Sequence, residues 1–103
     1  MKKFEGILIC TDLDWTIVRS DKTVSQADLE AIEYFKSEGG LFTFITARML
    51  CHTADVRAMI HVNAPLGCLN GGALYDEKID DFVWTQEIDP SVFELARYVD
   101  TNI

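Results

Sequence analysis

The sequence has 103 residues, of which 49% are hydrophobic, so it holds enough apolar side chains for one small globular domain and not for two. Its 17 acidic and 9 basic residues give a formal net charge of −8. This charge excludes a surface for nucleic acid or for an anionic membrane, because such polyanions select clustered Lys and Arg. The longest apolar run covers residues 7–10, far below the roughly 18 residues of a membrane helix. We therefore expect a cytoplasmic protein.

Short apolar strands alternate with helices in the first part of the chain. Residues 7–11 lack polar alternation, which predicts a central parallel strand that is buried on both faces. Ser25 is a typical N-cap for an amphipathic helix that stops at Gly39-Gly40. Residues 41–45 predict a second buried strand, and a second helix follows before Pro65.

The second part of the chain contains a hairpin and a final helix. Residues 66–69 predict a third strand, and the apolar runs 73–75 and 82–84 flank a polar turn that is typical of a β-hairpin. Asp89-Pro90 predicts the start of a helix that continues to the C-terminus. Because strands and helices alternate at this spacing, we expect right-handed crossovers and a three-layer, Rossmann-like α/β fold with a parallel sheet.

The most unusual polar residues follow the first two strands. The carboxyl ends of parallel strands meet at one edge of a sheet, so Asp12 and Asp14 are expected to lie near Thr46. Two carboxylates this close repel each other unless they share a proton or a cation. Mg²⁺ suits such a site because it needs few carboxylates and keeps several waters.

These residues together predict a metal-assisted phosphoryl-transfer site. One carboxylate would be the nucleophile and the other the general acid and base, while the Thr46 hydroxyl and the free amides of the following helix would bind the phosphoryl group. The alternative is ordinary turn chemistry, in which Asp12 and Asp14 accept hydrogen bonds from loop amides. The spacing alone leaves both interpretations open.

The motifs resemble those of the haloacid dehalogenase-like (HAD) superfamily. The segment 12–16, Asp-Leu-Asp-Trp-Thr, is similar to its first motif, DxDxT, and the segment 44–48, Phe-Ile-Thr-Ala-Arg, is similar to its second motif. The segment 69–73 with the hairpin after it resembles the Cof-like branch, whose members carry an α/β cap inserted after the third core strand. The resemblance covers nearly the whole chain.

This resemblance implies a Mg²⁺-dependent phosphohydrolase that acts on a small phosphorylated substrate. Asp12 would form an aspartyl-phosphate, and Asp14 would protonate the leaving oxygen and later activate water. A carboxylate oxygen of Asp12 and the backbone carbonyl of Asp14 would hold the ion. The second motif would supply Thr46, Ala47 and Arg48 to the substrate, and Asn70 would join them. Arg48 has an alternative role in a structural ion pair, and Asn70 has one as a turn residue.

The sequence departs from the family in two respects. Trp15 occupies the position directly after the acid/base, where the family usually has Gly. The family's third-motif Lys and fourth-motif acidic cluster find no match after Thr46. We therefore expect an N-terminal part of a longer hydrolase, with a core at residues 1–88 and the first helix of a cap at residues 89–103.

Two other classes of function stay open. The chain is either part of such a hydrolase, a non-catalytic Mg²⁺-binding α/β module, or a structural fragment held by a partner. If the chain is an N-terminal part of such a hydrolase, the resemblance implies that the first strand lacks a neighbour on one side, and its apolar edge would favour a homo-oligomer or pairing with a C-terminal portion.

Overall fold

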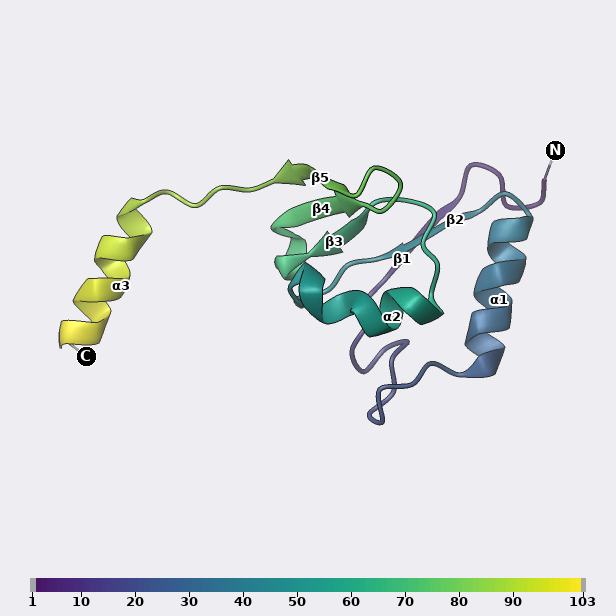
Figure 1. Ribbon diagram of the computed structural model, residues 1–103, viewed down its shortest axis with the longest axis horizontal. Coiled ribbons are helices and arrows are strands. Elements are labelled where there is room, and N and C mark those ends of the chain that lie inside the picture. Colours follow the sequence, from purple (N-terminus) through teal and green to yellow (C-terminus); the bar gives the residue numbers. More distant parts are fainter. Residues whose placement is uncertain (1, 103) are drawn as a thin grey trace.

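Two small β-sheets and two helices form the body of the computed structural model, which describes residues 2–102 (Figure 1). Strands β1 (Leu8–Thr11) and β2 (Leu41–Phe44) are parallel, with Leu8 opposite Leu41. A second sheet is antiparallel and has the order β3-β4-β5. Its strands are β3 (Leu66–Cys68), β4 (Ala73–Asp76) and β5 (Asp81–Thr85).

The two sheets meet where β2 ends. Ile45 forms an isolated parallel bridge with Gly67 of β3, and the amide of Thr46 donates to the Gly67 carbonyl at 2.9 Å. The first three strands therefore run parallel to one another, in the order in which they occur in the sequence. The predicted α/β fold is confirmed, and so are the third strand and the hairpin.

Helix α1 (Gln26–Ser37) begins and ends at the residues that the sequence predicts. The Ser25 hydroxyl accepts a hydrogen bond from the amide of Asp28 at 3.1 Å, which satisfies a free donor of the first turn. After the helix, Gly39 has a φ of +91°, and a Cβ on Gly40 would lie 2.3 Å from the ring of Phe35. Only glycine allows the chain to turn this tightly onto β2.

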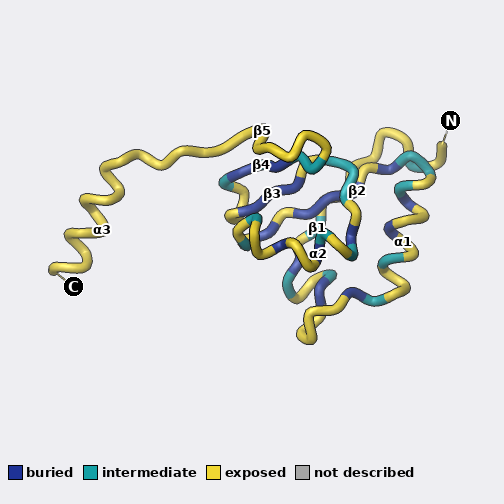
Figure 2. Tube along the Cα trace, viewed as in Figure 1, coloured by how far each residue is buried: buried dark blue, intermediate teal, exposed yellow. Residues whose placement is uncertain are grey.

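Helix α2 (Ala54–Met59) follows the short 3₁₀ helix η1 (Leu50–Thr53), and a second 3₁₀ turn, η2 (Leu69–Gly71), follows β3. Buried residues occur in β2, β3, β4, α1, α2 and the loop between β1 and α1, whereas β1 and β5 hold none (Figure 2). The largest side chains that are almost fully buried are Phe44, Leu13, Ile60, Leu66 and Val56.

The prediction that β1 is buried on both faces is wrong for this chain. Leu8 and Ile9 are 57% and 42% exposed. Among residues 2–102, β2 is the strand that pairs with β1, and the other edge of β1 has no strand beside it. Apolar composition predicts what a strand prefers to contact, whereas its burial depends on neighbours that lie elsewhere in the fold. The expected open edge is confirmed.

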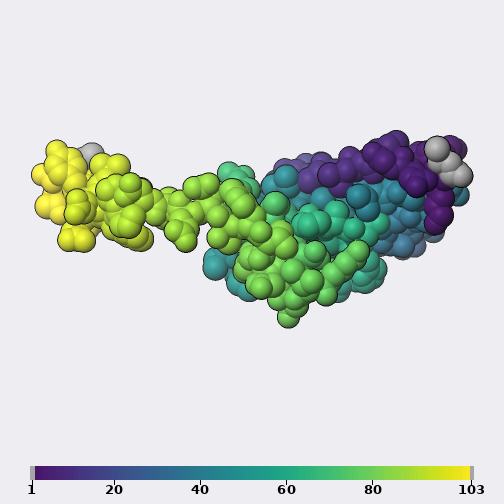
Figure 3. Space-filling model, turned by 90° about the horizontal axis from the view of Figure 1, so that it is seen from above, coloured from purple at the N-terminus to yellow at the C-terminus, as the bar shows by residue number. Residues whose placement is uncertain are grey.

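Helix α3 (Ser91–Asn102) lies apart from the body at the end of an extended segment (Figure 3). The Asp89 side chain accepts from the Ser91 amide at 3.0 Å and caps the helix as expected. All its described residues are exposed, and the molecule reaches 58 Å along its longest axis. That this helix begins an inserted cap stays a prediction. Within residues 2–102 no helix has the length and apolar character needed to cross a membrane.

Candidate functional site

Asp12 lies directly after β1, at the carboxyl end of the strand. One of its carboxylate oxygens accepts a hydrogen bond from the amide of Leu13 at 2.9 Å. The residue lines a cavity of about 330 Å³ together with Thr11, Ile45 and Asn70, which come from the ends of β1, β2 and β3. The strand ends therefore form a common cavity, as the parallel arrangement predicts.

The turn after Asp12 is anchored by Leu13. This side chain is fully buried, and its carbonyl accepts hydrogen bonds from the amides of Thr16, Ile17 and Val18. Trp15 has a φ of +65°, and its amide donates to the Val18 carbonyl at 3.1 Å. The position that holds Gly in the family therefore takes the left-handed conformation here with a Trp, whose side chain is 84% exposed.

Asp14 forms a two-point ion pair with Arg48. The Nε of Arg48 lies 3.0 Å from one carboxylate oxygen of Asp14, and a terminal nitrogen lies 2.5 Å from the other. This hydrogen bonding from Arg48 lowers the pKa of Asp14 below its ordinary value of 3.8, and the same contact raises the pKa of Arg48. Asp14 is therefore held as a carboxylate.

Arg48 also binds the segment that leads into α2. Its second terminal nitrogen donates to the His52 carbonyl at 3.0 Å and lies 3.5 Å from the carboxylate of Asp55. Its side chain is 15% exposed, against 45% for Asp14. The structural ion pair that the sequence left open for Arg48 is thus present.

Thr46 and Asn70 are joined through the backbone at the end of β2. The Thr46 hydroxyl accepts from the amide of Arg48 at 3.1 Å, and the Thr46 carbonyl accepts from the amide of Asn70 at 2.8 Å. Thr46 is 2% exposed, whereas Ala47 and Asn70 are exposed. Asn70 has a φ of +54°, which agrees with its alternative role as a turn residue.

Four of the six predicted site residues line two separate cavities, whereas Thr46 and Ala47 line neither of them. Asp12 and Asn70 line the cavity at the strand ends, whereas Asp14 and Arg48 line a second cavity of about 340 Å³ beside the loop between β1 and α1. That Asp12 and Asp14 reach a common ion stays a prediction.

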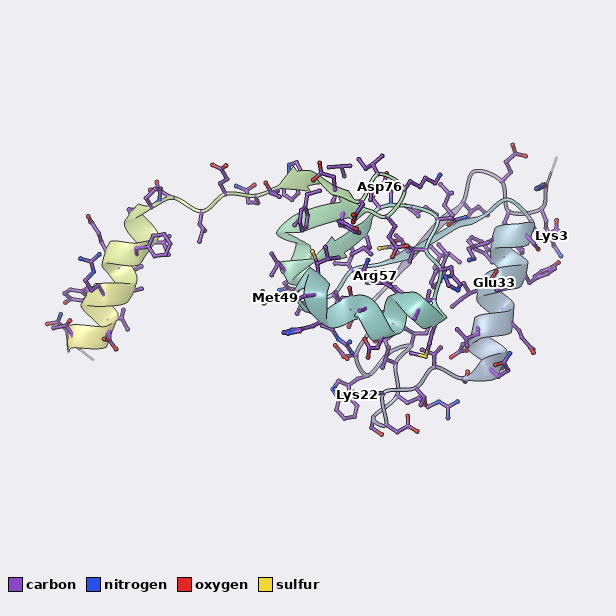
Figure 4. All side chains as sticks on the ribbon, in the orientation of Figure 1. Lys3, Lys22, Glu33, Met49, Arg57 and Asp76 are labelled. Carbon is purple, nitrogen blue, oxygen red and sulfur yellow. The ribbon has the colours of Figure 1, made fainter. Side chains whose placement is uncertain are left out.

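Arg19 and Lys22, which no sequence motif indicates as site residues, also line this second cavity. Figure 4 shows Lys22 on the loop between β1 and α1. A turn in which the Lys22 amide donates to the Arg19 carbonyl at 2.9 Å brings both residues to the cavity of Asp14. Both residues lie in a loop without hydrophobic periodicity, so the sequence does not predict that they line the cavity of Asp14.

The donors at the strand ends are oxygen atoms, which suit Mg²⁺. Within residues 2–102 no three His, Cys, Asp or Glu side chains lie together as a metal-binding group. A hard ion that keeps most of its waters needs fewer protein ligands than zinc does. That Asp12 and the backbone carbonyl of Asp14 hold such an ion stays a prediction.

Comparison with known proteins identifies the family of this chain. A family model described as haloacid dehalogenase-like hydrolase matches residues 9–102. The stress response protein YhaX of Bacillus subtilis (strain 168) is 27% identical over 95 residues, which are 91% of this chain and 33% of that protein.

Solved structures share the fold at lower identity. A haloacid dehalogenase-like hydrolase from B. subtilis superposes with a TM-score of 0.77 at 19% identity, over 91% of this chain and 33% of that one. BT1666 from Bacteroides thetaiotaomicron, described among phosphatases of the HAD superfamily, gives 0.70 at 18% identity, over 97% and 39%. The chain thus spans about a third of the length of these proteins. By the match to the family model, it belongs to the haloacid dehalogenase-like hydrolases.

Proposed function

We propose that this chain carries the nucleophile and the acid/base of a Mg²⁺-dependent phosphohydrolase that acts on a small phosphorylated metabolite. The observation that supports the proposal most is the convergence of three strand ends. Asp12 lies at the end of β1, beside the end of β2 and beside Asn70, in a cavity of about 330 Å³. BT1666, with the same fold, is described as a phosphatase.

The reaction has two covalent steps. A carboxylate oxygen of Asp12 forms a bond to phosphorus while the bond from phosphorus to the alcohol oxygen breaks, and Asp14 gives its proton to that oxygen. Asp14 then takes a proton from water as the water attacks the phosphorus. Inorganic phosphate leaves, and the Asp12 carboxylate is restored. The oxygen of the water ends in the inorganic phosphate, and the proton that Asp14 takes from the water replaces the one it gave to the alcohol.

Asp14 needs a change of partner in order to act as an acid. The structure pairs it with Arg48, which lowers the pKa of Asp14 and favours the carboxylate form that the second step requires. Protonation in the first step requires Arg48 to move away or to share its contact with the substrate. When bound, Mg²⁺ would neutralise charge on the phosphate, held by Asp12 and the backbone of Asp14.

The test is phosphatase activity toward para-nitrophenyl phosphate with and without Mg²⁺, for this chain and for any longer product of the same gene. We expect Asp12→Asn to abolish the activity, because the amide is no longer a nucleophile. Asp81→Asn, an exposed position on β5, is the matched control and should keep it. Activity of Asp12→Asn equal to the unmodified protein would contradict the covalent mechanism.

A second candidate is a module that binds Mg²⁺ without turnover. The contact of both carboxylate oxygens of Asp14 with Arg48 favours it for the chain alone, because Asp14 is then not free to move a proton. Calorimetric titration with Mg²⁺ separates the two candidates. Binding that depends on Asp12 without hydrolysis by any longer product supports the module.

A further inference from the structure

The exposed indole of Trp15 is the feature of this molecule that the proposed reaction leaves unused. Its side chain is 84% exposed, although it follows Asp14 directly and lines the same cavity. Its backbone takes a φ of +65°, a conformation that glycine adopts more easily. The turn thus holds a large aromatic ring in solvent at a conformational cost.

The cavity beside Trp15 is rich in positive charge, although the chain carries a net charge of −8. Of the three basic residues that line it, Arg48 is neutralised by Asp14. Within residues 2–102, Arg19 and Lys22 form no ion pair. A cavity lined by an aromatic ring and by two cations outside any ion pair is suited to a ligand that is both planar and anionic.

The position of Trp15 in the cavity of Asp14 relates the ring to the leaving group. Asp14 is proposed to protonate the leaving oxygen, and Trp15 lines the same cavity as Asp14, so a group attached to that oxygen lies within reach of the indole. A planar group attached to the leaving oxygen can therefore stack on the indole. Stacking on an aromatic side chain tolerates many ring systems, because it requires a flat face and no particular hydrogen bonds.

We propose that Trp15 is a stacking platform that selects phosphate monoesters whose alcohol carries a planar aromatic ring, with Arg19 and Lys22 adding attraction for the anion. The inference rests on the proposed function, because it names the substrate class of that same site. Loss of the stack should weaken binding of such an ester on the order of tenfold or more. Esters without the ring should bind the same with or without Trp15.

The sequence offers a direct optical test, because it contains two tryptophans, Trp15 and Trp84. In Trp84→Phe, all tryptophan fluorescence comes from Trp15. We expect adenosine 5′-monophosphate to quench this fluorescence with saturation, and ribose 5-phosphate, which has the same phosphate and sugar without the base, to leave it nearly unchanged. Adenosine without the phosphate should quench only at much higher concentration.

A second variant tests the role of the ring in affinity. Trp15→Gly suits the positive φ and keeps the fold, which circular dichroism checks. By calorimetry its affinity for adenosine 5′-monophosphate should fall to that for ribose 5-phosphate, whereas Trp84→Phe, the matched control, should keep the difference. Equal affinity for the two esters in the unmodified chain would overturn the inference, and so would quenching by adenosine as strong as by the nucleotide.

The same two esters separate this inference from the proposed function. Hydrolysis of both at rates that do not depend on Trp15 rejects the stacking platform and leaves the phosphohydrolase standing. Saturable quenching by the nucleotide, without hydrolysis of either ester by any longer product of the gene, rejects the phosphohydrolase and supports the platform. If the fluorescence of Trp15 changes with protein concentration and not with nucleotide, the ring lies in a contact between protein chains. That result would overturn the stacking proposal.

Discussion

Arg48 stabilises the carboxylate form of Asp14. The guanidinium contacts both carboxylate oxygens and is itself mostly buried, so its hydrogen bonds lower the pKa of Asp14. A lowered pKa in the folded protein means that the pair stabilises the fold above the ordinary value of 3.8. That contribution disappears as the pH falls through the lower, folded-state pKa.

We predict that the coupling between these two residues depends on pH. A double-mutant cycle of Arg48→Met and Asp14→Asn, followed by urea unfolding, should give about 1 kcal/mol at pH 7, since Asp14 is nearly half exposed and solvent screens the pair. The coupling should shrink as the pH falls below 3.8. A coupling that is constant across this range would show that packing, and not charge, joins the two residues.

Thr46 allows a test of the phosphate site that leaves the carboxylates intact. Its buried hydroxyl accepts from the amide of Arg48, so its own proton is free for a phosphoryl oxygen. In a catalytically active product of the gene, Thr46→Ala should lower kcat on the order of a hundredfold, the usual effect of losing one positioned donor. Thr46→Ser keeps the hydroxyl and should retain most of the rate. A rate for Thr46→Ala equal to that of Thr46→Ser would remove Thr46 from the site.

At the scale of elements, α1 is stabilised by its N-cap, the hydrogen bond from the Asp28 amide to the Ser25 hydroxyl, which the sequence predicts. Ser25→Ala removes the acceptor for the Asp28 amide, and we expect the free energy of unfolding to fall by about 1 kcal/mol. Ser25→Asp keeps an acceptor at the same place and adds a charge that the helix dipole favours. Urea denaturation of both variants measures the difference, and equal losses in the two would contradict the capping role.

Such local signals explain why the element boundaries could be predicted. The cap at Ser25, the glycine stop and the Asp89 cap each act within a few residues of the helix end. The burial of β1 and the pair between Asp14 and Arg48 depend on residues far away in the sequence, 34 positions apart for the pair. The spacing of these residues along the chain did not indicate that Asp14 and Arg48 form a two-point ion pair.

The same distinction applies to the candidate site. The strand-end placement of Asp12 follows from the parallel order of β1 and β2, which alternation of strands and helices predicts. The separate cavity of Asp14 lies beside the turn at Trp15, where the residue itself, a Trp in place of the family's Gly, does not indicate the positive φ that the backbone takes. The sequence therefore predicts that Asp12 lies at the end of β1, whereas the conformation of the following loop determines which cavity Asp14 lines.

At the scale of the whole molecule, the open edge of β1 is the largest departure from a closed sheet. Leu8 and Ile9 are exposed on this strand, and the backbone donors and acceptors on its free side have no strand partner within residues 2–102. Unpaired strand edges with apolar side chains favour pairing with another chain. In solution this chain should therefore form dimers or larger species.

Light scattering and sedimentation across a range of protein concentrations measure this association. A charge on the edge strand should oppose it, because pairing would bury the charge, so Ile9→Lys should shift the equilibrium toward monomer by on the order of tenfold or more. Tyr34→Lys, at an exposed apolar position of α1, removes a similar patch without touching a strand and should leave the association unchanged. Val83→Lys on the exposed strand β5 tests the opposite edge of the fold. Association that is weakened by Val83→Lys and not by Ile9→Lys would place the contact on the hairpin. A strictly monomeric chain would show that the edge of β1 stays solvated and does not pair with another chain.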